Sequence, residues 1–381
     1  MEREPLRLAF LFIAEAYQVY HAAAVMFELM RRSDITVDVF YIDPASPAAL
    51  ERLRKTHNAA SFEMTRLPSG LAGAAIQSVR ILGLAKPQVL RKNEAKLRKY
   101  DAIVSTEDGI TALFRDLQEA NRPARILITH GADARAVPDR QKRRDCDLIL
   151  AKGPRDVALH LEKGHSEPGK IVAAGYPKFT SLLALGRDDK PLFANSNPTV
   201  LYNSHKEPRQ RSWDRFFKPM VHLFEEHTDR NLVVAPHIKL FRRRPSGYRA
   251  RIESRTADNI KIDLGSDRLL DGTYLEQADI YVGDVSSQVY EFLANPRPCI
   301  FLNAHKVQWQ QDPAYAMWHL GEVIDDPQDL LPAIRRAPKL HSEFVARQKE
   351  AAERSLGDTS PNSVVYGADL IETFVRNWPK G

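Results

Sequence analysis

The sequence of 381 residues contains only two cysteines, Cys146 and Cys299, and each lies in an apolar, strand-like stretch. This placement is typical of buried thiols in a reducing compartment rather than of a disulfide. No apolar run approaches the length of about 20 residues that a membrane-spanning helix needs. The early run Leu6–Ile13 follows acidic residues and precedes no small-residue cleavage site, so we interpret it as a buried strand rather than a signal peptide. We therefore expect a cytoplasmic protein.

Several motifs are also absent. The chain has no Walker A loop, no GxGxxG, no GxSxG and no CxxC pair. Asp145-Cys146-Asp147 has the spacing of a metal-binding DxD motif, but it lies where a strand is expected to begin, away from the edge at which parallel sheets bind ligands. The sequence therefore predicts neither a metal site nor a cofactor.

The charge excess is small, because 55 Lys and Arg against 49 Asp and Glu leave a formal charge of +6. It permits an anionic ligand or peripheral contact with an anionic membrane, and it does not indicate a dedicated nucleic-acid binder. A hydrophobic content of 43% and a charged content of 27% are typical of globular proteins. The length fits two domains of roughly 150–200 residues each.

Short apolar runs alternate with amphipathic stretches along the whole chain, which is the pattern of parallel βαβ units. The runs rich in Val, Ile and Leu predict strands over 6–13, 36–43, 100–106, 125–130, 147–152, 171–176, 199–203, 231–236, 260–264, 279–282 and 299–303. Apolar spacing of three to four residues predicts helices over 15–32, 90–99, 110–120, 155–163, 212–227, 287–293 and 327–336, and a helical tail over 339–379 with a turn at 357–361.

Polar turn-formers and prolines interrupt this alternation near residues 183–198. We therefore predict an N-terminal Rossmann-like domain over 1–185, a linker over 186–198, a C-terminal Rossmann-like domain over 199–345 and a helical tail over 346–381; the family resemblance described below implies that the first is the acceptor domain and the second the nucleotide-donor domain. Two doubly wound domains of this kind would face each other across a cleft at the carboxyl ends of their strands. The tail helices would pack back on the N-terminal domain.

A buried strand followed by two serines and a helix stands out at 278–292. Gly283 permits a tight turn, and Ser286 and Ser287 at a helix start offer hydroxyl and backbone N–H groups to a phosphate. Glu291 lies one helical turn after Ser287 and is placed to reach a ribose hydroxyl. The alternative is that these serines only cap a helix. The donor-binding candidates of this segment are Gly283, Asp284, Ser286, Ser287, Gln288 and Glu291.

Two histidines each follow a predicted strand, His130 in the first half and His237 in the second. A histidine at this edge of a sheet can take a proton from an attacking hydroxyl, or it can simply bond a loop carbonyl. One histidine per domain favours a catalytic pair across the cleft.

Two further segments carry candidate ligand contacts. The strand 199–203 gives way to a polar loop that offers Asn203, His205 and Lys206 to a nucleotide phosphate. The densest basic run, 239–251, is a candidate for a polyanionic acceptor or anionic lipid, although a solvated charged loop would look the same. The acceptor or polyanion candidates are Gly131, Asp133, Lys239, Arg242, Arg243 and Arg244.

The ordered set of these motifs resembles the CDP-glycerol glycerophosphotransferases, which are teichoic-acid polymerases and primases with the GT-B fold. The segment 278–302 is similar to their "D-Y-S-S" signature followed by "R-P" and an apolar run, with Val285 in place of the tyrosine. His130-Gly131 is similar to their "W-H-G-T", with Ala132-Asp133 in place of Thr-Pro. Pro236-His237, the stretch 200–205 and the stretch 175–178 follow in the family's order.

The resemblance implies a transferase that moves glycerol phosphate, or a related alditol phosphate, from a CDP-linked donor to an acceptor hydroxyl in teichoic-acid, capsule or other cell-envelope polymer synthesis. His130 would be the general base, His237 would stabilise developing charge, and the acceptor would be a polymer or a lipid-linked molecule at the inner face of the membrane. Two other enzyme classes fit the same scaffold, a glycosyltransferase with a UDP-, GDP- or CMP-sugar donor and a UDP-sugar 2-epimerase. A non-catalytic nucleotide- or polyanion-binding protein is the remaining alternative.

Overall fold

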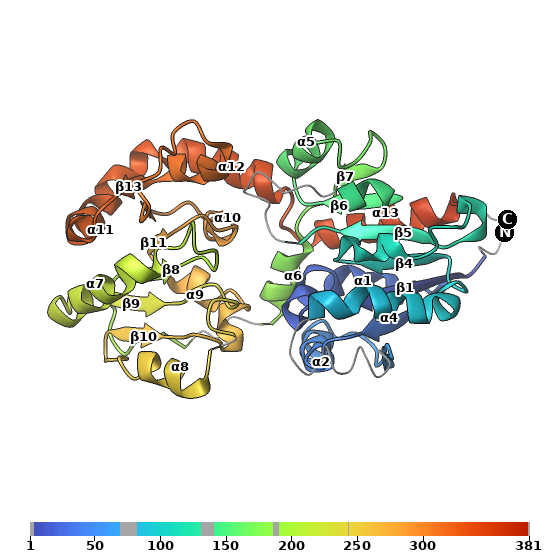
Figure 1. Ribbon diagram of the computed structural model, residues 1–381, viewed down its shortest axis with the longest axis horizontal. Coiled ribbons are helices and arrows are strands. Elements are labelled where there is room, and N and C mark those ends of the chain that lie inside the picture. The colour runs from blue at the N-terminus through green and yellow to red at the C-terminus, as the bar shows by residue number, and fades with distance from the viewer. Residues whose placement is uncertain (1–3, 69–81, 131–140, 186–189, 243, 380–381) are drawn as a thin grey trace. The chain divides into compact units, whose positions relative to one another are not determined.

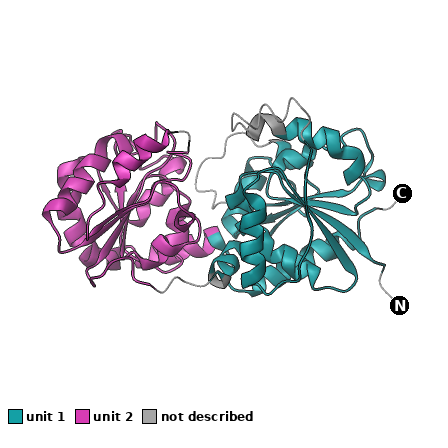
Figure 2. Ribbon diagram, turned by 90° about the horizontal axis from the view of Figure 1, so that it is seen from below, with its two compact units in different colours: residues 1–130, 138–186, 356–381 teal, residues 131–137, 187–355 magenta. Residues whose placement is uncertain are grey.

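The computed structural model describes residues 4–68, 82–130, 141–185, 190–242 and 244–379. The chain forms two compact units, shown in different colours in Figure 2. Unit 1 contains residues 1–130, 138–186 and 356–381, and unit 2 contains residues 131–137 and 187–355. Most of unit 2 is the continuous stretch 187–355, and the last segment of the chain belongs to unit 1 again.

Unit 1 is built on a parallel sheet of seven strands in the order β3-β2-β1-β4-β5-β6-β7 (Figure 1). The strands are β1 (Leu6–Phe12), β2 (Ile35–Tyr41), β3 (Met64–Arg66), β4 (Ala102–Ser105), β5 (Ala124–Ile128), β6 (Leu148–Ala151) and β7 (Ile171–Ala173). Every residue of β4, β5 and β6 is buried, as expected of strands covered on both faces. The sequence predicted all of these strands except the short β3.

The helices of unit 1 are α1 (Ala23–Met30), α2 (Ser46–Thr56), α4 (Leu82–Leu97), α5 (Pro154–Glu162), α6 (Pro177–Ala184) and α13 (Asn362–Arg376). The predicted helix over 15–32 is in fact two elements, the 3₁₀ helix η1 (Ala16–His21) and α1, with non-helical dihedral angles at Ala22 between them.

The prediction of an α-helix over 110–120 is wrong. The chain instead forms the short 3₁₀ helix η2 (Asp108–Ala112), and Phe114, two residues after its end, adopts a left-handed φ of 58°. Side chains replace the helical hydrogen bonds, because the Glu94 carboxylate accepts the Phe114 N–H at 2.6 Å and Arg125 donates to the carbonyl of Leu113 at 3.3 Å. The apolar spacing was real, but it serves a buried turn rather than a helix.

Unit 2 repeats the design with a parallel sheet of six strands in the order β10-β9-β8-β11-β12-β13. Its strands are β8 (Thr199–Asn203), β9 (Asn231–Val234), β10 (Ile260–Ile262), β11 (Ile280–Gly283), β12 (Cys299–Leu302) and β13 (Glu322–Ile324). Its helices are α7 (Trp213–Glu226), α8 (Ser246–Glu253), α9 (Thr273–Gln277), α10 (Gln288–Phe292), α11 (Leu330–Leu340) and α12 (Val345–Leu356). The sequence pattern does not predict the short strand β13, and the basic run that contains α8 was expected to be a loop.

The predicted fold class is therefore confirmed: each unit is a doubly wound, Rossmann-like α/β domain. Apolar residues of β8, β9 and β11 pack with the apolar faces of α7 and α11 in the core of unit 2. Cys146 and Cys299 are buried free thiols, as predicted.

Two glycines fix the route of the chain into α13. Gly175 and Gly357 have φ angles of 86° and 63°. A Cβ at Gly175 would lie 2.5 Å from the carbonyl oxygen of Asp358, and one at Gly357 would lie 2.4 Å from that of Lys152. The Tyr176 N–H donates to Asp358 O at 2.7 Å across the same junction. The segment before α13 therefore lies directly against the ends of β6 and β7.

We expect Gly357→Ala to destabilise the protein more than a left-handed φ alone explains, because the new methyl would also collide with backbone. Gly164→Ala is the matched control, since Gly164 has a φ of 64° and a Cβ added there would meet nothing within 4 Å. The control should lose about 1–2 kcal/mol, and Gly357→Ala clearly more. Urea unfolding followed by circular dichroism measures both, and equal losses would contradict the collision.

Candidate functional site

Polar side chains gather at the carboxyl edge of the sheet in unit 1, where β1, β4 and β5 lie side by side. The residues after β1 form η1, Thr106 and Glu107 follow β4, and His130 follows β5. The Asp43 carboxylate, after β2, accepts the N–H of Ala16 at 3.1 Å and so holds the start of η1. With three residues per turn, a 3₁₀ helix places residues i and i+3 on one side, and this brings Gln18 and His21 together.

His130 has a defined ring orientation. Its Nδ1 lies 2.8 Å from the carbonyl oxygen of Thr106. A carbonyl oxygen only accepts hydrogen bonds, so Nδ1 carries the hydrogen and Nε2 of the neutral ring carries the lone pair. The side-chain amide nitrogen of Gln18 lies 3.3 Å from this Nε2. The neutral ring of His130 therefore has a hydrogen-bond acceptor at Nε2.

Glu107 is tied to this histidine indirectly. One carboxylate oxygen accepts a hydrogen bond from Gln18 at 2.7 Å, and the other accepts one from Lys86 at 2.9 Å. Burial raises the pKa of Glu107, but the positive charges of Lys86 and a protonated His130, together with these hydrogen bonds, outweigh burial and leave the pKa below its usual value. The carboxylate is ionised at neutral pH.

His21 packs against His130 with 6.1 Å between ring centroids and against Tyr176 with 5.6 Å. It is only 5% exposed. Burial, followed by the positive charges of Lys178, His130 and Lys152, holds the pKa of His21 well below its usual value. His21 is therefore neutral at pH 7 and adds no charge beside His130.

A buried ionic network supports the strand ends behind this cluster. Lys152 donates to Thr129 Oγ1 at 3.1 Å and to Asp156 at 3.2 Å. Burial raises the pKa of Asp156, but Lys152, His160 and Thr129 more than offset it and lower the pKa overall. Thr129 precedes His130, so this network fixes the backbone that carries the histidine.

The sequence pattern predicts His130 as a site residue, and it does not single out Gln18, His21, Lys86 or Glu107, which the structure places near it. Gln18 and His21 lie in the stretch 15–32, where the spacing of the apolar residues predicts a helix and gives no sign of a polar cluster. Glu107 directly follows the strand predicted over 100–106. A polar residue directly after a parallel strand was the available signal. The candidates Gly131 and Asp133 lie outside the described residues.

A second cluster lies at the carboxyl edge of the sheet in unit 2. His205 follows β8, His237 follows β9, and their rings meet edge to face at 5.7 Å. The Nδ1 atoms of His205 and His237 accept backbone N–H groups, from Glu207 at 3.2 Å and from Lys239 at 3.1 Å. In the neutral rings the hydrogens are then on Nε2. These histidines are donors at Nε2, the opposite of His130.

The Asp284 carboxyl, directly after β11, organises this edge. Its Oδ2 accepts hydrogen bonds from Ser204 Oγ at 2.9 Å, His205 N at 2.7 Å and Ser212 N at 2.8 Å. Its Oδ1 is buried and has no hydrogen-bond partner among the described residues. Burial raises the pKa of Asp284 to about 6, although these hydrogen bonds oppose the rise.

Asn203 and Gly283 fit together at the same place. Asn203 donates to Ala235 O at 2.6 Å and to Gln288 Oε1 at 2.8 Å, and it accepts from the Tyr281 hydroxyl at 3.0 Å. A Cβ at Gly283 would lie 2.5 Å from the carbonyl oxygen of Asn203. The glycine is thus needed for close approach, and not for a tight turn as predicted.

The twin serines precede α10, which has only five residues. Ser286 Oγ accepts the N–H of Gln288 at 3.3 Å, while Ser287 makes no capping hydrogen bond through its side chain. Glu291 is buried within α10. A short helix has a small dipole, so hydroxyl and N–H groups, more than the dipole, are what this turn offers a phosphate.

The basic run after His237 includes α8. Lys239 and Arg242 are half-buried, whereas Arg244 is exposed and stacks over the ring of Tyr248 at 5.5 Å. Tyr248 is 47% exposed. Lys206 is half-buried after His205, and Arg243 lies outside the described residues.

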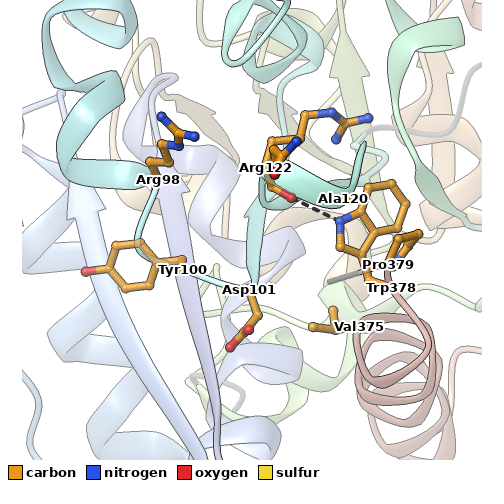
Figure 3. Close-up of a pocket in the computed structure, with 9 residues that line it drawn as sticks. Arg98, Tyr100, Asp101, Ala120, Arg122, Val375, Trp378 and Pro379 are labelled. Carbon is orange, nitrogen blue, oxygen red and sulfur yellow. Dashed lines mark hydrogen bonds between the residues drawn. The ribbon is translucent and has the colours of Figure 1, made fainter. Parts of the chain in front are cut away.

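A polar cavity of about 320 Å³ lies at the opposite, amino-terminal edge of the sheet in unit 1 (Figure 3). Tyr100 and Asp101 precede β4, and the indole N–H of Trp378, just after α13, donates to the carbonyl oxygen of Arg122 at 3.0 Å. Doubly wound sheets bind ligands at the other edge, so this cavity is not the candidate site.

In the described part of the chain, no three His, Cys, Asp or Glu side chains are gathered closely enough to hold a metal ion. None of the helices described there has the length and apolar character needed to cross a membrane.

No protein-family model matches the chain, and no curated protein matches its sequence. Solved structures do match its fold. The S. aureus MnaA–UDP complex is 14% identical with a TM-score of 0.65, covering 98% of this chain and 99% of that one. UDP-GlcNAc 2-epimerase from Neisseria meningitidis bound to UDP-GlcNAc is 13% identical with a TM-score of 0.61, covering 97% and 99%. A variant of the wall teichoic acid polymerase TagF soaked with CDPG is 12% identical with a TM-score of 0.64, covering 98% and 89%. The chain therefore has the GT-B-like fold that these enzymes share.

We expect the contribution of Asp284 to stability to fall as pH rises from about 4 to 6, because folding raises the pKa of Asp284 above its unfolded value near 4 and the folded state then binds the extra proton. The contribution is favourable at low pH and is lost above pH 6, amounting to at most about 3 kcal/mol. Asp284→Asn removes the titrating group and keeps an acceptor oxygen. Denaturation between pH 4.5 and 7.5 should show the stability of Asp284→Asn rising relative to that of the wild type, and a constant difference between the two proteins would contradict the burial cost.

Proposed function

We propose that this protein is a transferase that uses a nucleotide-activated donor, and that it moves glycerol phosphate or a related alditol phosphate from a CDP-linked donor to an acceptor hydroxyl during cell-surface polymer synthesis. The observation that carries the proposal is the opposite hydrogen placement on the histidines of the two units. His130 offers a lone pair at Nε2, whereas His237 offers an N–H at Nε2. A phosphoryl transfer needs both a base and a donor for developing negative charge.

In the proposed step, His130 accepts the proton of the acceptor hydroxyl as its oxygen attacks the β-phosphorus of the donor. A new P–O bond forms to the acceptor, and the bond from this phosphorus to the bridging oxygen of the CMP moiety breaks. CMP leaves with the electron pair of that bond, and the proton held by His130 passes to solvent. His237 donates to the oxygens on which charge increases. All bonds, the electron pair and the proton of this step are accounted for by the donor, the acceptor and His130, and the proposed step uses neither a metal ion nor a cofactor.

Unit 2 is the proposed donor site. Ser286, Ser287 and the backbone of their turn would bind the pyrophosphate, and Glu291 would bind the ribose. Asn203 is the last residue of the neighbouring strand β8, and His205 and Lys206 lie on the loop after it, so all three are at the same edge. TagF soaked with CDPG and MnaA bound to UDP share this fold, which supports a nucleotide-activated donor; the choice of CDP within that class comes from the sequence motifs of unit 2.

The basic segment after His237 is the proposed contact for an anionic acceptor or membrane surface. Lys239, Arg242 and Arg244 carry its charge, and the exposed ring of Tyr248 adds an amphipathic group beside Arg244. Charges arranged in this way bind phosphate-rich polymers or anionic lipid headgroups at the cytoplasmic face of a membrane.

A second candidate is a UDP-sugar 2-epimerase. Structures named as UDP-GlcNAc 2-epimerases match the fold as completely as TagF does. Such an enzyme would use the same donor site without an acceptor, and His130 would move a proton on the sugar. A glycosyltransferase would differ in releasing a nucleoside diphosphate.

Incubation of the purified protein with CDP-glycerol and a glycerol phosphate acceptor that carries a free glycerol hydroxyl should release CMP. His130→Ala should lower kcat by a factor on the order of 10²–10⁴, because the general base is lost, and should leave donor affinity intact. Chromatography of the nucleotide product gives the rate, and calorimetric titration with CDP-glycerol gives the affinity.

The matched control is His222→Ala, which removes an exposed histidine from α7 and should leave turnover unchanged. Near-normal turnover of His130→Ala would remove His130 from the mechanism. Conversion of UDP-GlcNAc to a 2-epimer without an acceptor would establish the alternative, and release of a nucleoside diphosphate from a sugar donor would indicate a glycosyltransferase.

A further inference from the structure

One amide group connects Glu107 to His130. Gln18 is only 3% exposed, and three polar partners fix which end of its amide points where. Its oxygen accepts from the Thr106 hydroxyl at 2.8 Å, and its nitrogen lies 2.7 Å from a Glu107 carboxylate oxygen, which can only accept. The remaining amide hydrogen is available for Nε2 of His130 at 3.3 Å.

We propose that Gln18 is a positioning residue, which keeps His130 neutral with its lone pair at Nε2 and gives up this hydrogen bond when the acceptor hydroxyl arrives. The inference rests on the proposed function only in assigning His130 the role of base. A hydrogen bond donated to a lone pair stabilises the unprotonated ring. At 3.3 Å this bond is long, so a hydroxyl can replace it at little cost.

The amide also acts as a spacer between opposite charges. A carboxylate bonded directly to His130 would favour the imidazolium and consume the base before substrate binds. With Gln18 in between, the carboxylate of Glu107 stays near enough to stabilise the charge that His130 gains during the reaction, without protonating it beforehand. Lys86 bonds the far oxygen of Glu107 and moderates this effect.

Among the described residues, charged or titratable groups near His130 lie on η1, after β4 and on α4. His21 of η1 is neutral at pH 7, Glu107 follows β4, and Lys86 of α4 pairs with Glu107. His21 lacks a hydrogen-bond partner for Nδ1 among the described residues, so it contributes a ring contact to His130 and no ion pair. Gln18 through its hydrogen bond and Glu107 through its charge therefore both act on the protonation state of His130.

Two variants of Gln18 separate its roles. Gln18→Glu keeps the shape and places a second carboxylate directly at Nε2, and Gln18→Met removes both amide hydrogens at similar volume. Gln118→Met is the matched control, because Gln118 is an exposed glutamine of the same unit that caps no helix through its side chain. Thermal unfolding confirms that each variant folds.

The readout is the ring nitrogen spectrum of His130 in ¹⁵N-histidine-labelled full-length protein, assigned with His130→Gln and titrated from pH 5 to 9 without substrate. We expect the wild type to show the Nδ1–H tautomer, which is the minor form of free histidine. Gln18→Glu should raise the midpoint of the His130 titration by more than about one pH unit, a tenfold gain in proton affinity. Gln18→Met should raise it by less, and Gln118→Met should not move it.

An Nε2–H tautomer in the wild type, or an unchanged midpoint in Gln18→Glu, would overturn the inference. This measurement needs no turnover, so absence of CMP release from CDP-glycerol would count against the proposed function alone. Where turnover is found, Gln18→Met should lower kcat at least tenfold with little change in the KM for the donor, and a change confined to KM would also overturn the inference.

Discussion

The buried carboxyl of Asp284 is the group on which the carboxyl edge of unit 2 depends. One of its oxygens holds three donors from two segments, the loop after β8 and the start of α7, against the end of β11. Placing this group where water does not reach it costs free energy, which shows in its raised pKa. Because His205 donates its own N–H to Asp284, the position of that histidine follows directly from this bond.

At the same sheet edge of the two units, histidines have opposite hydrogen-bonding roles at Nε2, and main-chain groups decide which role each ring has. A carbonyl oxygen beside Nδ1 makes His130 an acceptor at Nε2, and an N–H group beside Nδ1 makes His205 and His237 donors at Nε2. The difference lies in how the chain turns after each strand. The residue type alone therefore does not tell whether Nε2 of a histidine at this edge accepts or donates a hydrogen bond.

How far the sequence leads depends on which forces shape each element. Strands buried on both faces, such as β5 and β8, are continuous apolar runs and were predicted to within one or two residues. The turn at Phe114 was not, because the Glu94 carboxylate replaces helical hydrogen bonds from 20 residues away. Likewise His130 was predicted from its place after a strand, whereas Gln18 was hidden in an apolar repeat whose first turns fold as a 3₁₀ helix.

Unit 1 is assembled from pieces separated by the whole of unit 2. Its helix α13 covers α1, and Gly357 leads into it through a contact with Lys152 that leaves no room for a side chain. During synthesis on the ribosome, the face of α1 that packs against α13 therefore stays uncovered until unit 2 has been made. Unit 1 is therefore complete only after unit 2 has been synthesised, although its seven strands are made first.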